Sequence, residues 1–400
     1  MRELALVFLR LGTTAFGGPA AHIAMMEDEL VRRRGWLTRE ELLDLVGAAG
    51  LIPGPSSTEV AIYIGYRRAG WRGLVVGGLC FIMPAALMVT AIAWAYVRFG
   101  RLPAVAGMLY GIKAVIIAIV GQALVAFGRT AIKSRWLLAL GIAAAAANAL
   151  GASPVLVLLG AGLVSAAPAI ARRPKGPKAP KAPKAPKAPK APKGPKEEAS
   201  SPAFWPGALG MTGTTSITAA TAAAAPASLT KLFLVFLKIG AIVFGSGYVL
   251  LAFLRADLVE STHWLTESQL VDSVAVGQFT PGPVFTTATF IGYLVAGFPG
   301  AVVATIGIFL PSFLLVAVSG PLIPRLRRSP IAGAFLDGVN VASLALMGVV
   351  GAQLVRAAIV DVPTAVLALG AAAALFRWRI NSAWLVLAGG AVGAALQWLR

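Results

Sequence analysis

The stretch Leu4-Ala5-Leu6-Val7-Phe8-Leu9-Arg10-Leu11-Gly12 recurs later in the chain as Leu232-Phe233-Leu234-Val235-Phe236-Leu237-Lys238-Ile239-Gly240. Rarer residues keep the same offset of 228 positions: Trp36-Leu37-Thr38 matches Trp264-Leu265-Thr266, and Pro53-Gly54-Pro55 matches Pro281-Gly282-Pro283. After one deletion, the match continues with Pro84 and Pro311, and with Gly111 and Gly338. Composition alone does not keep tryptophan and paired prolines in register over such a length, so the chain is an internal duplication.

Long apolar stretches make up most of each copy. Gly70–Val97, Leu102–Phe127 and Ile331–Val355 contain one charged residue each, and every one exceeds the roughly 20 residues that cross a bilayer. Hydrophobic residues form 58% of the chain and charged residues 13%. A water-soluble helical bundle, the alternative, needs a much larger polar surface. The sequence therefore predicts an all-α polytopic membrane protein.

Between the copies lies a segment of different character. We divide the chain into a first repeat at 1–171, a Pro/Lys/Ala-rich cytoplasmic linker at 172–228 and a second repeat at 229–400. Regular prolines in Pro174–Lys196 exclude helix and favour an extended chain. The stretch Arg172–Glu198 carries +8 of the net charge of +19, and much of the rest lies in short loops, as the positive-inside rule expects. We therefore expect no nucleic-acid partner, and the linker is either a solvated spacer or a contact for anionic lipid.

Several other classes of protein are not expected from the composition. The opening apolar segment Leu4–Phe16 leads into the charged stretch Glu27–Arg34 rather than a cleavage site, so we expect it in the mature protein. Cys80 is the single cysteine, and the two histidines, His22 and His263, form no ligand cluster. We expect no metal, no cofactor and no enzymatic activity, and the lack of a Walker-type phosphate loop argues against direct use of ATP.

Pro-Gly-Pro interrupts a helix in each copy, because proline lacks an amide proton and disfavours helical backbone in the residue before it. In the first copy, the break leaves Thr38–Ile52 and Ser56–Arg67 too short to cross a membrane, and basic clusters lie on both sides of this unit. We predict a re-entrant helical hairpin with Pro-Gly-Pro at its tip, covered by protein or by a water-filled cavity.

Five crossings remain in the first copy. They are Leu4–Leu30 (broken near Gly17-Gly18-Pro19), Gly70–Val97, Leu102–Gly128, Trp136–Leu150 and Pro154–Ala171. An odd number inverts the second copy, and the distribution of Arg and Lys agrees with this. We predict two inverted repeats with about ten crossings and two re-entrant hairpins, a recurring plan of secondary transporters. If Leu4–Leu30 or the Pro-Gly-Pro unit is counted differently, the copies are parallel.

The half-helices that follow the breaks are candidates for anion binding. A helix N-terminus presents unpaired amides and about half a positive charge, which suits an oxyanion. The alternative is that the breaks only fit the fold; because four breaks are paired by symmetry, we favour a site. The predicted substrate-binding residues are Gly17, Gly18, Pro19, Pro53, Gly54, Pro55, Ser56, Ser57, Thr58 and Lys113 in the first copy, and Gly245, Ser246, Pro281, Gly282, Pro283 and Thr286 in the second.

Ionisable residues inside apolar segments are functional candidates, because they cost about 2.5 to 3.5 kcal/mol on insertion scales. The proton-coupling candidates are Glu59, Asp337, Asp44 and its copy Asp272. Glu59 is the first of these, since removal from water favours the protonated form of a carboxyl group. Lys113 and Asp337 lie one turn from each other's symmetry-related positions. We hypothesise that they pair across the pseudo-two-fold axis and that an entering anion competes for Lys113.

The order of three motifs resembles the chromate transporter family in its two-domain, long-chain form: Phe16-Gly17-Gly18-Pro19, Arg33-Arg34-Gly35-Trp36-Leu37 and Leu51-Ile52-Pro53-Gly54-Pro55. The second copy departs from this pattern at Ser246-Gly247, where the first has Gly18-Pro19, and at Val284-Phe285, where the first has Ser56-Ser57. We therefore expect the first copy to supply more of the anion contacts. The resemblance implies a multi-pass protein of the bacterial inner membrane that exports chromate, driven by the proton-motive force, and thereby confers chromate resistance.

The expected function is thus secondary transport of chromate, with the oxyanion, protons and the lipid bilayer as partners. Sulfate and chromate share charge and shape, so a sulfate or molybdate carrier is the nearest alternative. A passive anion channel and a non-transporting membrane scaffold are alternatives from other classes. The oligomeric state stays open, with a homodimer among the possibilities.

Overall fold

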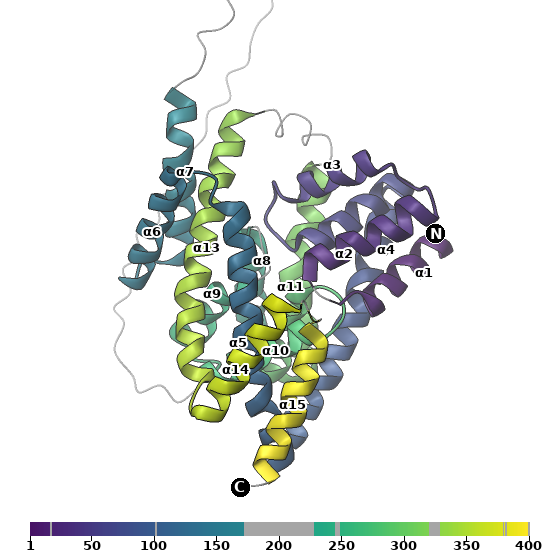
Figure 1. Ribbon diagram of the computed structural model, residues 1–400. Coiled ribbons are helices and arrows are strands. Elements are labelled where there is room, and N and C mark those ends of the chain that lie inside the picture. The colour runs from purple at the N-terminus through teal and green to yellow at the C-terminus, as the bar shows by residue number, and fades with distance from the viewer. Residues whose placement is uncertain are drawn as a thin grey trace, which may run out of the picture. The chain divides into compact units, whose positions relative to one another are not determined.

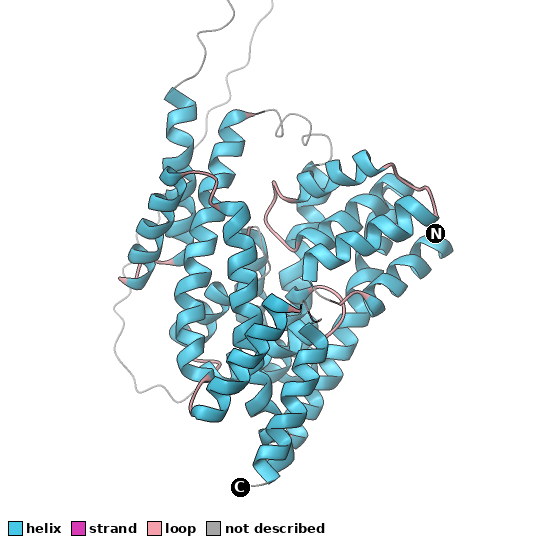
Figure 2. Cartoon of the chain, in the orientation of Figure 1, coloured by secondary structure: helices cyan, strands magenta, loops and turns pink. Residues whose placement is uncertain are grey.

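The computed structural model describes residues 1–16, 18–100, 102–171, 228–244, 249–319, 329–378, 380 and 382–398. Within these ranges the elements are helices joined by turns and loops, and no strand is present (Figures 1 and 2). The predicted all-helical class is confirmed. The predicted linker falls outside the described residues, apart from Ser228.

The described helices follow the same order in the two copies, apart from a 3₁₀ turn that only the second has. The first copy has α1 (Arg2–Thr14), α2 (Gly18–Met26), the π-helix η1 (Glu27–Arg33), α3 (Arg39–Ala49), α4 (Ser56–Phe99), α5 (Pro103–Ala131), α6 (Arg135–Ala149) and α7 (Pro154–Ala171). The second has α8 (Leu229–Ile242), α9 (Leu250–Leu254), the π-helix η2 (Arg255–Ser261), α10 (Glu267–Phe279), the 3₁₀ turn η3 (Val284–Thr286), α11 (Thr287–Ser319), α13 (Pro330–Ala358), α14 (Val362–Arg377) and α15 (Ser382–Trp398).

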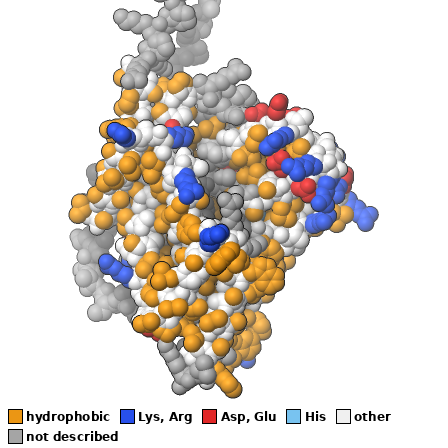
Figure 3. Space-filling model, viewed as in Figure 1, with side chains coloured by type: hydrophobic (Ala, Val, Ile, Leu, Met, Phe, Trp, Pro, Cys, Tyr) orange, Lys and Arg blue, Asp and Glu red, His pale blue; other side chains and the backbone are white. Residues whose placement is uncertain are grey.

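Five described helices are long and apolar enough to cross a membrane: Ser56–Phe99, Val105–Ala131, Pro154–Ala171, Val284–Ser319 and Pro330–Ala358. Apolar side chains cover most of the face in Figure 3, and charged ones gather mainly over the α1–α4 part of it. Large apolar side chains are exposed on these helices, among them Trp71, Leu87, Leu163, Ile306 and Val318. An apolar exterior of this kind suits lipid rather than water. The chain is a multi-pass membrane protein.

The repeated Trp-Leu-Thr motif starts a helix in both copies. The Thr38 hydroxyl accepts from the Glu41 amide at 3.2 Å, and the Glu41 carboxylate accepts from the Thr38 amide at 2.8 Å. Thr266 and Gln269 form the same reciprocal pair at the start of α10. This capping box satisfies amides that a helix start otherwise leaves without partners, so the motif is retained for a local structural reason.

Pro-Gly-Pro ends one helix and starts the next in both copies, as predicted: α3 ends at Ala49, and α4 begins at Ser56. The piece that follows is short, because α4 leaves helical geometry at Ala69 and Gly70. A Cβ atom at Gly65 would overlap the carbonyl oxygen of Gly73, which shows that the chain reverses at this turn. Residues 56–68 thus form a short arm packed against the long arm that follows.

In the second copy, α11 turns in the same way at Ala296 and Gly297, and Gly292 packs on Gly300. Glycine is needed at these contacts because the two backbones touch.

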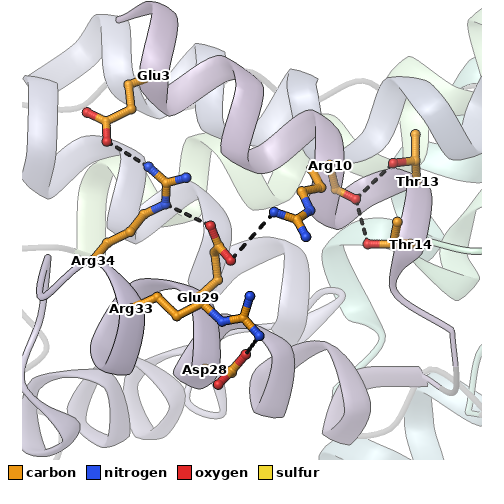
Figure 4. A network of polar contacts seen from close by, with 8 residues as sticks. All are labelled: Glu3, Arg10, Thr13, Thr14, Asp28, Glu29, Arg33 and Arg34. Atoms are coloured by element: carbon orange, nitrogen blue, oxygen red, sulfur yellow. Dashed lines mark hydrogen bonds and ion pairs between the residues drawn. The ribbon is translucent and has the colours of Figure 1, made fainter.

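The predicted single crossing Leu4–Leu30 is wrong. Arg34 Nη1 lies 2.7 Å from Glu3 Oε1, and Arg10 Nη1 lies 4.0 Å from Glu29 Oε2 (Figure 4). As the position on α1 advances from Glu3 to Arg10, its contact moves back from Arg34 to Glu29, so the segment is an antiparallel hairpin. The break near Gly18, which has φ +77°, reverses the chain rather than bending it. The same reversal occurs in the second copy, where Lys238 Nζ lies 2.6 Å from Asp257 Oδ1.

Equivalent long helices of the two copies run in opposite directions. Tyr63, near the turn of α4, hydrogen-bonds Ser319 at the end of α11. At the opposite end, the ring of Tyr96, close to the end of α4, lies 5.3 Å from the ring of Phe290, close to the turn of α11. The start of each long arm therefore lies beside the end of the other, which makes the two arms antiparallel.

The helices α5 and α13 repeat this relationship. Lys133, just past the end of α5, lies 2.6 Å from Asp337 near the start of α13. A Cβ atom at Gly351, far along α13, would lie 3.4 Å from Leu124 of α5. A two-fold axis perpendicular to these helices thus relates the copies. The inversion was predicted from an odd number of crossings in the first copy, and the α1–η1 hairpin removes the first of these as a single crossing. The predicted antiparallel arrangement of the copies is nevertheless present.

Candidate functional site

The helix breaks of the two copies meet and exchange hydrogen bonds. The Gly54 amide donates to the carbonyl of Val243 at 2.8 Å, and the Gly282 amide donates to the carbonyl of Ala15 at 2.9 Å. Val243 and Ala15 are equivalent positions, as are Gly54 and Gly282. Each Pro-Gly-Pro segment is therefore held by the residue that follows the other copy's first helix, Val243 in one case and Ala15 in the other.

Glu59 lies at this convergence and is fully buried. Its Oε1 accepts from the Ser312 hydroxyl at 3.4 Å, while Oε2 has no hydrogen-bond partner among the described residues. A Cβ atom at Gly54 would overlap both Glu59 Oε1 and Ser312 Oγ, so only glycine fits there. The carboxyl group thus lies between the Pro-Gly-Pro segment of its own copy and α11 of the other.

The first turn of α4 carries a second buried polar atom without a partner. The amides of Thr58 and Glu59 donate to the carbonyl of Pro55 at 2.8 and 3.1 Å. The Thr58 hydroxyl is completely buried and has no partner in the described part of the chain. A buried hydroxyl left unsatisfied costs free energy, so it is a natural donor for a bound ligand.

His22 is a site residue that sequence reasoning missed. Its ring is 1% exposed, with Nδ1 3.0 Å from Ser57 Oγ and Nε2 3.1 Å from the carbonyl oxygen of Ala15. From the sequence, His22 was considered only as a metal ligand, and a hydrogen-bonding role was not considered for it. A signal was available, because Leu250 occupies the equivalent position in the second copy and a polar residue inside an apolar segment requires a partner.

Asp272 forms the second buried polar group between the copies. It is 2% exposed; Lys113 Nζ lies 3.2 Å from its Oδ1, and Tyr96 donates to its Oδ2 at 2.8 Å. The lysine contact is an ion pair rather than an aligned hydrogen bond, and Lys113 also donates to Ser268 at 2.6 Å. This cluster joins α4 and α5 of the first copy to α10 of the second.

The predicted pairing of Lys113 with Asp337 is wrong, because Asp337 pairs with Lys133 instead. Lys113 and Lys133 are separated by about 30 Å along α5 at 1.5 Å per residue. In an inverted arrangement, equivalent positions lie at opposite ends unless they are on the axis. The hypothesis required both residues to lie close to the axis, and neither does.

A scan against family models identifies the chromate transporter family, matching residues 2–166 and again 230–394. The chain belongs to the chromate transporter family. It is 35% identical over 398 residues to the chromate transport protein of Cupriavidus metallidurans, covering 98% of this chain and 92% of that protein. It is 31% identical to the probable chromate transport protein of Synechococcus elongatus, with coverage of 100% and 96%. No solved structure matches the chain.

Within this chromate transporter family member, the predicted site residues fall into three groups. Gly54, Glu59, Ser57, Thr58 and Gly282 come together where the copies meet. Gly17, Gly245 and Ser246 lie outside the described residues. The flanking predicted residues belong to the same breaks: Gly18, Pro19, Pro53, Pro55, Ser56, Pro281 and Pro283.

The remaining predicted residues lie apart from this centre or are already bonded. The Thr286 hydroxyl donates to the carbonyl of Pro283 at 2.8 Å, within its own turn. Asp44 is exposed, in contrast to its buried copy Asp272. An apolar cavity of about 600 Å³ lies beside Pro281, with Phe16 and Trp384 in its lining, which suits lipid better than an anion. Among the described residues, no group of three or more His, Cys, Asp or Glu could hold a metal ion.

Proposed function

We propose that the protein is a secondary transporter that exports chromate across the bacterial inner membrane, driven by the proton-motive force, and so confers chromate resistance. The family membership and the names of the relatives support chromate as the substrate. The observation that carries the mechanism is the buried Glu59 carboxyl group beside Gly54, where the two copies exchange hydrogen bonds.

The anion binds at the first turn of α4 in this proposal. The helix N-terminus supplies a partial positive charge, and the Thr58 hydroxyl supplies a donor that has no partner among the described residues. An ionised Glu59, one residue farther along, repels a dianion, whereas its protonated form does not. Proton binding at Glu59 and anion binding are therefore linked, because each raises the affinity for the other.

The membrane potential favours export of such a substrate. A potential that is negative inside moves each negative charge outward with about 2.3 kcal/mol per 100 mV, so a dianion gains about twice this value. A proton carried with it halves the net charge that moves. The number of protons carried with each anion thus sets how much the membrane potential and the pH difference each contribute to the free energy of transport.

The antiparallel copies support inverted membrane insertion, with each Pro-Gly-Pro segment at the tip of a re-entrant hairpin. Arg34 and Arg68 both lie close to Glu3, which places basic residues of the first copy at one end of the fold. By the positive-inside rule, we assign this end to the cytoplasm. Alternating access then consists of rocking one copy against the other about the exchanged hydrogen bonds. The passage of the chain between Ala171 and Ser228 lies outside the described residues, and a homodimer stays a prediction.

Inside-out membrane vesicles test the proposed function, because export appears there as uptake. We expect chromate uptake that responds to an imposed proton gradient and stops when an uncoupler is added. Uptake that follows only the gradient of the anion itself indicates a channel, and preferential uptake of sulfate indicates a sulfate carrier. No uptake of any oxyanion indicates a membrane scaffold, and each of these three results rejects the proposal.

A further inference from the structure

The buried ring of His22 bridges two elements of the first copy at the point where the second copy is hydrogen-bonded to it. The carbonyl oxygen of Ala15 accepts from His22 Nε2 at 3.1 Å and also from the Gly282 amide of the other copy at 2.9 Å. On its other side, Nδ1 lies 3.0 Å from Ser57 Oγ, in the first turn of α4. The ring therefore connects the exchanged hydrogen bonds to the helix start that binds the anion in the proposed function.

The hydrogen positions follow from what each partner can do. A carbonyl oxygen only accepts, so His22 Nε2 must carry a hydrogen. In the neutral ring, Nδ1 is then a bare acceptor, and the Ser57 hydroxyl must donate its one hydrogen to it. In this state the Ser57 oxygen presents only lone pairs to its other neighbours. It therefore cannot donate a hydrogen bond to an oxyanion.

Protonation of the ring reverses this bond. Nδ1 then carries a hydrogen and donates to Ser57 Oγ, so the hydroxyl hydrogen is released to point elsewhere. We propose that His22 is a positioning residue that links oxyanion binding to proton uptake, by turning the Ser57 hydroxyl from a donor to the ring into a donor to the anion. The freed hydroxyl joins the Thr58 hydroxyl, one residue farther along, as a second donor. This inference rests on the proposed function for its ligand.

Other ionisable groups lie on the elements packed around the ring. On α4, Glu59 follows Ser57 by two residues, and Cys80 precedes Phe81, whose ring meets the His22 ring edge-on at 5.6 Å. On α1, Arg10 pairs with Glu29 of the adjoining π-helix. A proton on His22 thus adds positive charge to a helix start whose nearest acid along the chain is Glu59.

The second copy lacks both members of this pair. Leu250 replaces the histidine and Phe285 replaces the serine, and both are buried in one apolar cluster. The two positions have therefore changed together, from a hydrogen-bonded pair to an apolar pair. The proton-linked hydroxyl belongs to the first copy alone.

Nitrogen NMR of the full chain in nanodiscs tests the inference directly, because the chain contains only two histidines. With ¹⁵N-labelled histidine, the variant His263→Asn leaves the His22 ring as the sole signal, and Asn tolerates the φ of +53° at position 263. We expect a neutral ring with hydrogen on Nε2 in the absence of anion. Saturating chromate, or sulfate as a dianion of constant charge, should convert it to the doubly protonated ring.

Substitutions separate the hydroxyl from the ring. In Ser57→Ala, the anion should no longer drive ring protonation. One linked proton changes the Kd for sulfate by up to about tenfold per pH unit, and this slope should be lost in Ser57→Ala and in His22→Leu. The double variant His22→Leu/Ser57→Phe carries the second copy's own pair; it should fold and show the same flat pH profile.

Two results would overturn the inference: a ring that stays neutral while the anion is bound, or a wild-type slope that persists in Ser57→Ala. Either leaves the proposed function standing if chromate still binds and is transported. Failure of the wild-type protein to bind chromate and sulfate at all removes the proposed function, and the inference falls with it.

Discussion

The first copy is polar at the place where the second is apolar. Beside its half-helix, the first has His22 hydrogen-bonded to Ser57, whereas the second has Leu250 and Phe285. Glu59 belongs to the first copy, and its carboxylate accepts a hydrogen bond from Ser312 of the second. The backbones of the two copies are thus related by symmetry, whereas the buried polar side chains at this place belong mainly to the first copy.

At the contact of α10 with α4 and α5, it is the second copy that supplies the buried carboxylate. Asp272 is buried and paired with Lys113, while its counterpart Asp44 is exposed. The comparison teaches that duplication supplied the geometry, namely the reversals, breaks and exchanged hydrogen bonds. Individual substitutions then gave the first copy the buried His22–Ser57 pair and the second copy the buried Asp272 carboxylate.

The largest effect is expected at the buried ion pair. Lys113→Met leaves the Asp272 carboxylate buried without its cation, which costs about 3 to 5 kcal/mol of stability. Thermal unfolding in detergent measures this. Lys113→Met/Asp272→Asn should recover most of the loss, and Asp44→Asn, at the exposed counterpart, should stay within about 0.5 kcal/mol. Equal losses for Asp44→Asn and Lys113→Met would contradict the difference between the copies.

The next effect tests the convergence of the breaks. In Gly54→Ala, the new methyl group overlaps Glu59 and Ser312, which adds about 1 to 3 kcal/mol to the backbone cost of a positive φ. Gly70→Ala is the matched control, because its φ is +57° and its surroundings are open. Thermal unfolding should show the larger loss for Gly54→Ala. Similar losses would mean that the centre is loosely packed.

A smaller effect is expected on transport coupling. Glu59→Gln keeps the shape of the side chain but cannot change its protonation, so chromate should still move down its own gradient. Accumulation should then lose its dependence on the imposed pH difference, which one carried proton makes about tenfold per pH unit, or about 1.4 kcal/mol. Flux in inside-out vesicles measures both, with the exposed Glu40→Gln as control. Unchanged accumulation in Glu59→Gln would remove this residue from coupling.

The smallest effect is expected at the capping boxes. Backbone hydrogen bonding from Thr38, followed by the contact with Arg67, holds the pKa of Glu41 below its ordinary value. The resulting stability is present above that ordinary value and is lost as the pH falls through the lowered one. Gln269 fills this position in the second copy and does not titrate.

Hydrogen exchange between about pH 6 and about pH 3 should therefore show the start of α3 opening before the start of α10. Glu41→Gln should remove the difference. Simultaneous opening of both starts would indicate a general acid effect rather than a local one.

The fold was largely predictable from the sequence because duplication and apolar length are global signals. The reversal of Leu4–Leu30 was not, since a glycine-proline break has the same appearance in sequence whether the chain bends or turns back. The partner of Lys113 was missed for a related reason. Repeat register gives equivalent positions, but it does not say how far each position lies from the axis.

The centre of the site was predictable in part. Proline and glycine positions marked the breaks, and an acid in an apolar segment marked Glu59. The exchange of hydrogen bonds between Gly54 and Val243 was not predictable, because it depends on how two distant loops meet. His22 was overlooked because a single histidine shows its role only through its neighbours, Ala15 and Ser57.

The exchanged hydrogen bonds make each copy structurally incomplete by itself. A lone first copy would leave the Gly54 amide and the Ala15 carbonyl without the partners that Val243 and Gly282 provide. A gene divided within the linker should therefore encode two fragments that are inactive when produced separately and active when produced in the same membrane. Complementation in cells would then report assembly of the two copies, independently of any covalent connection between them.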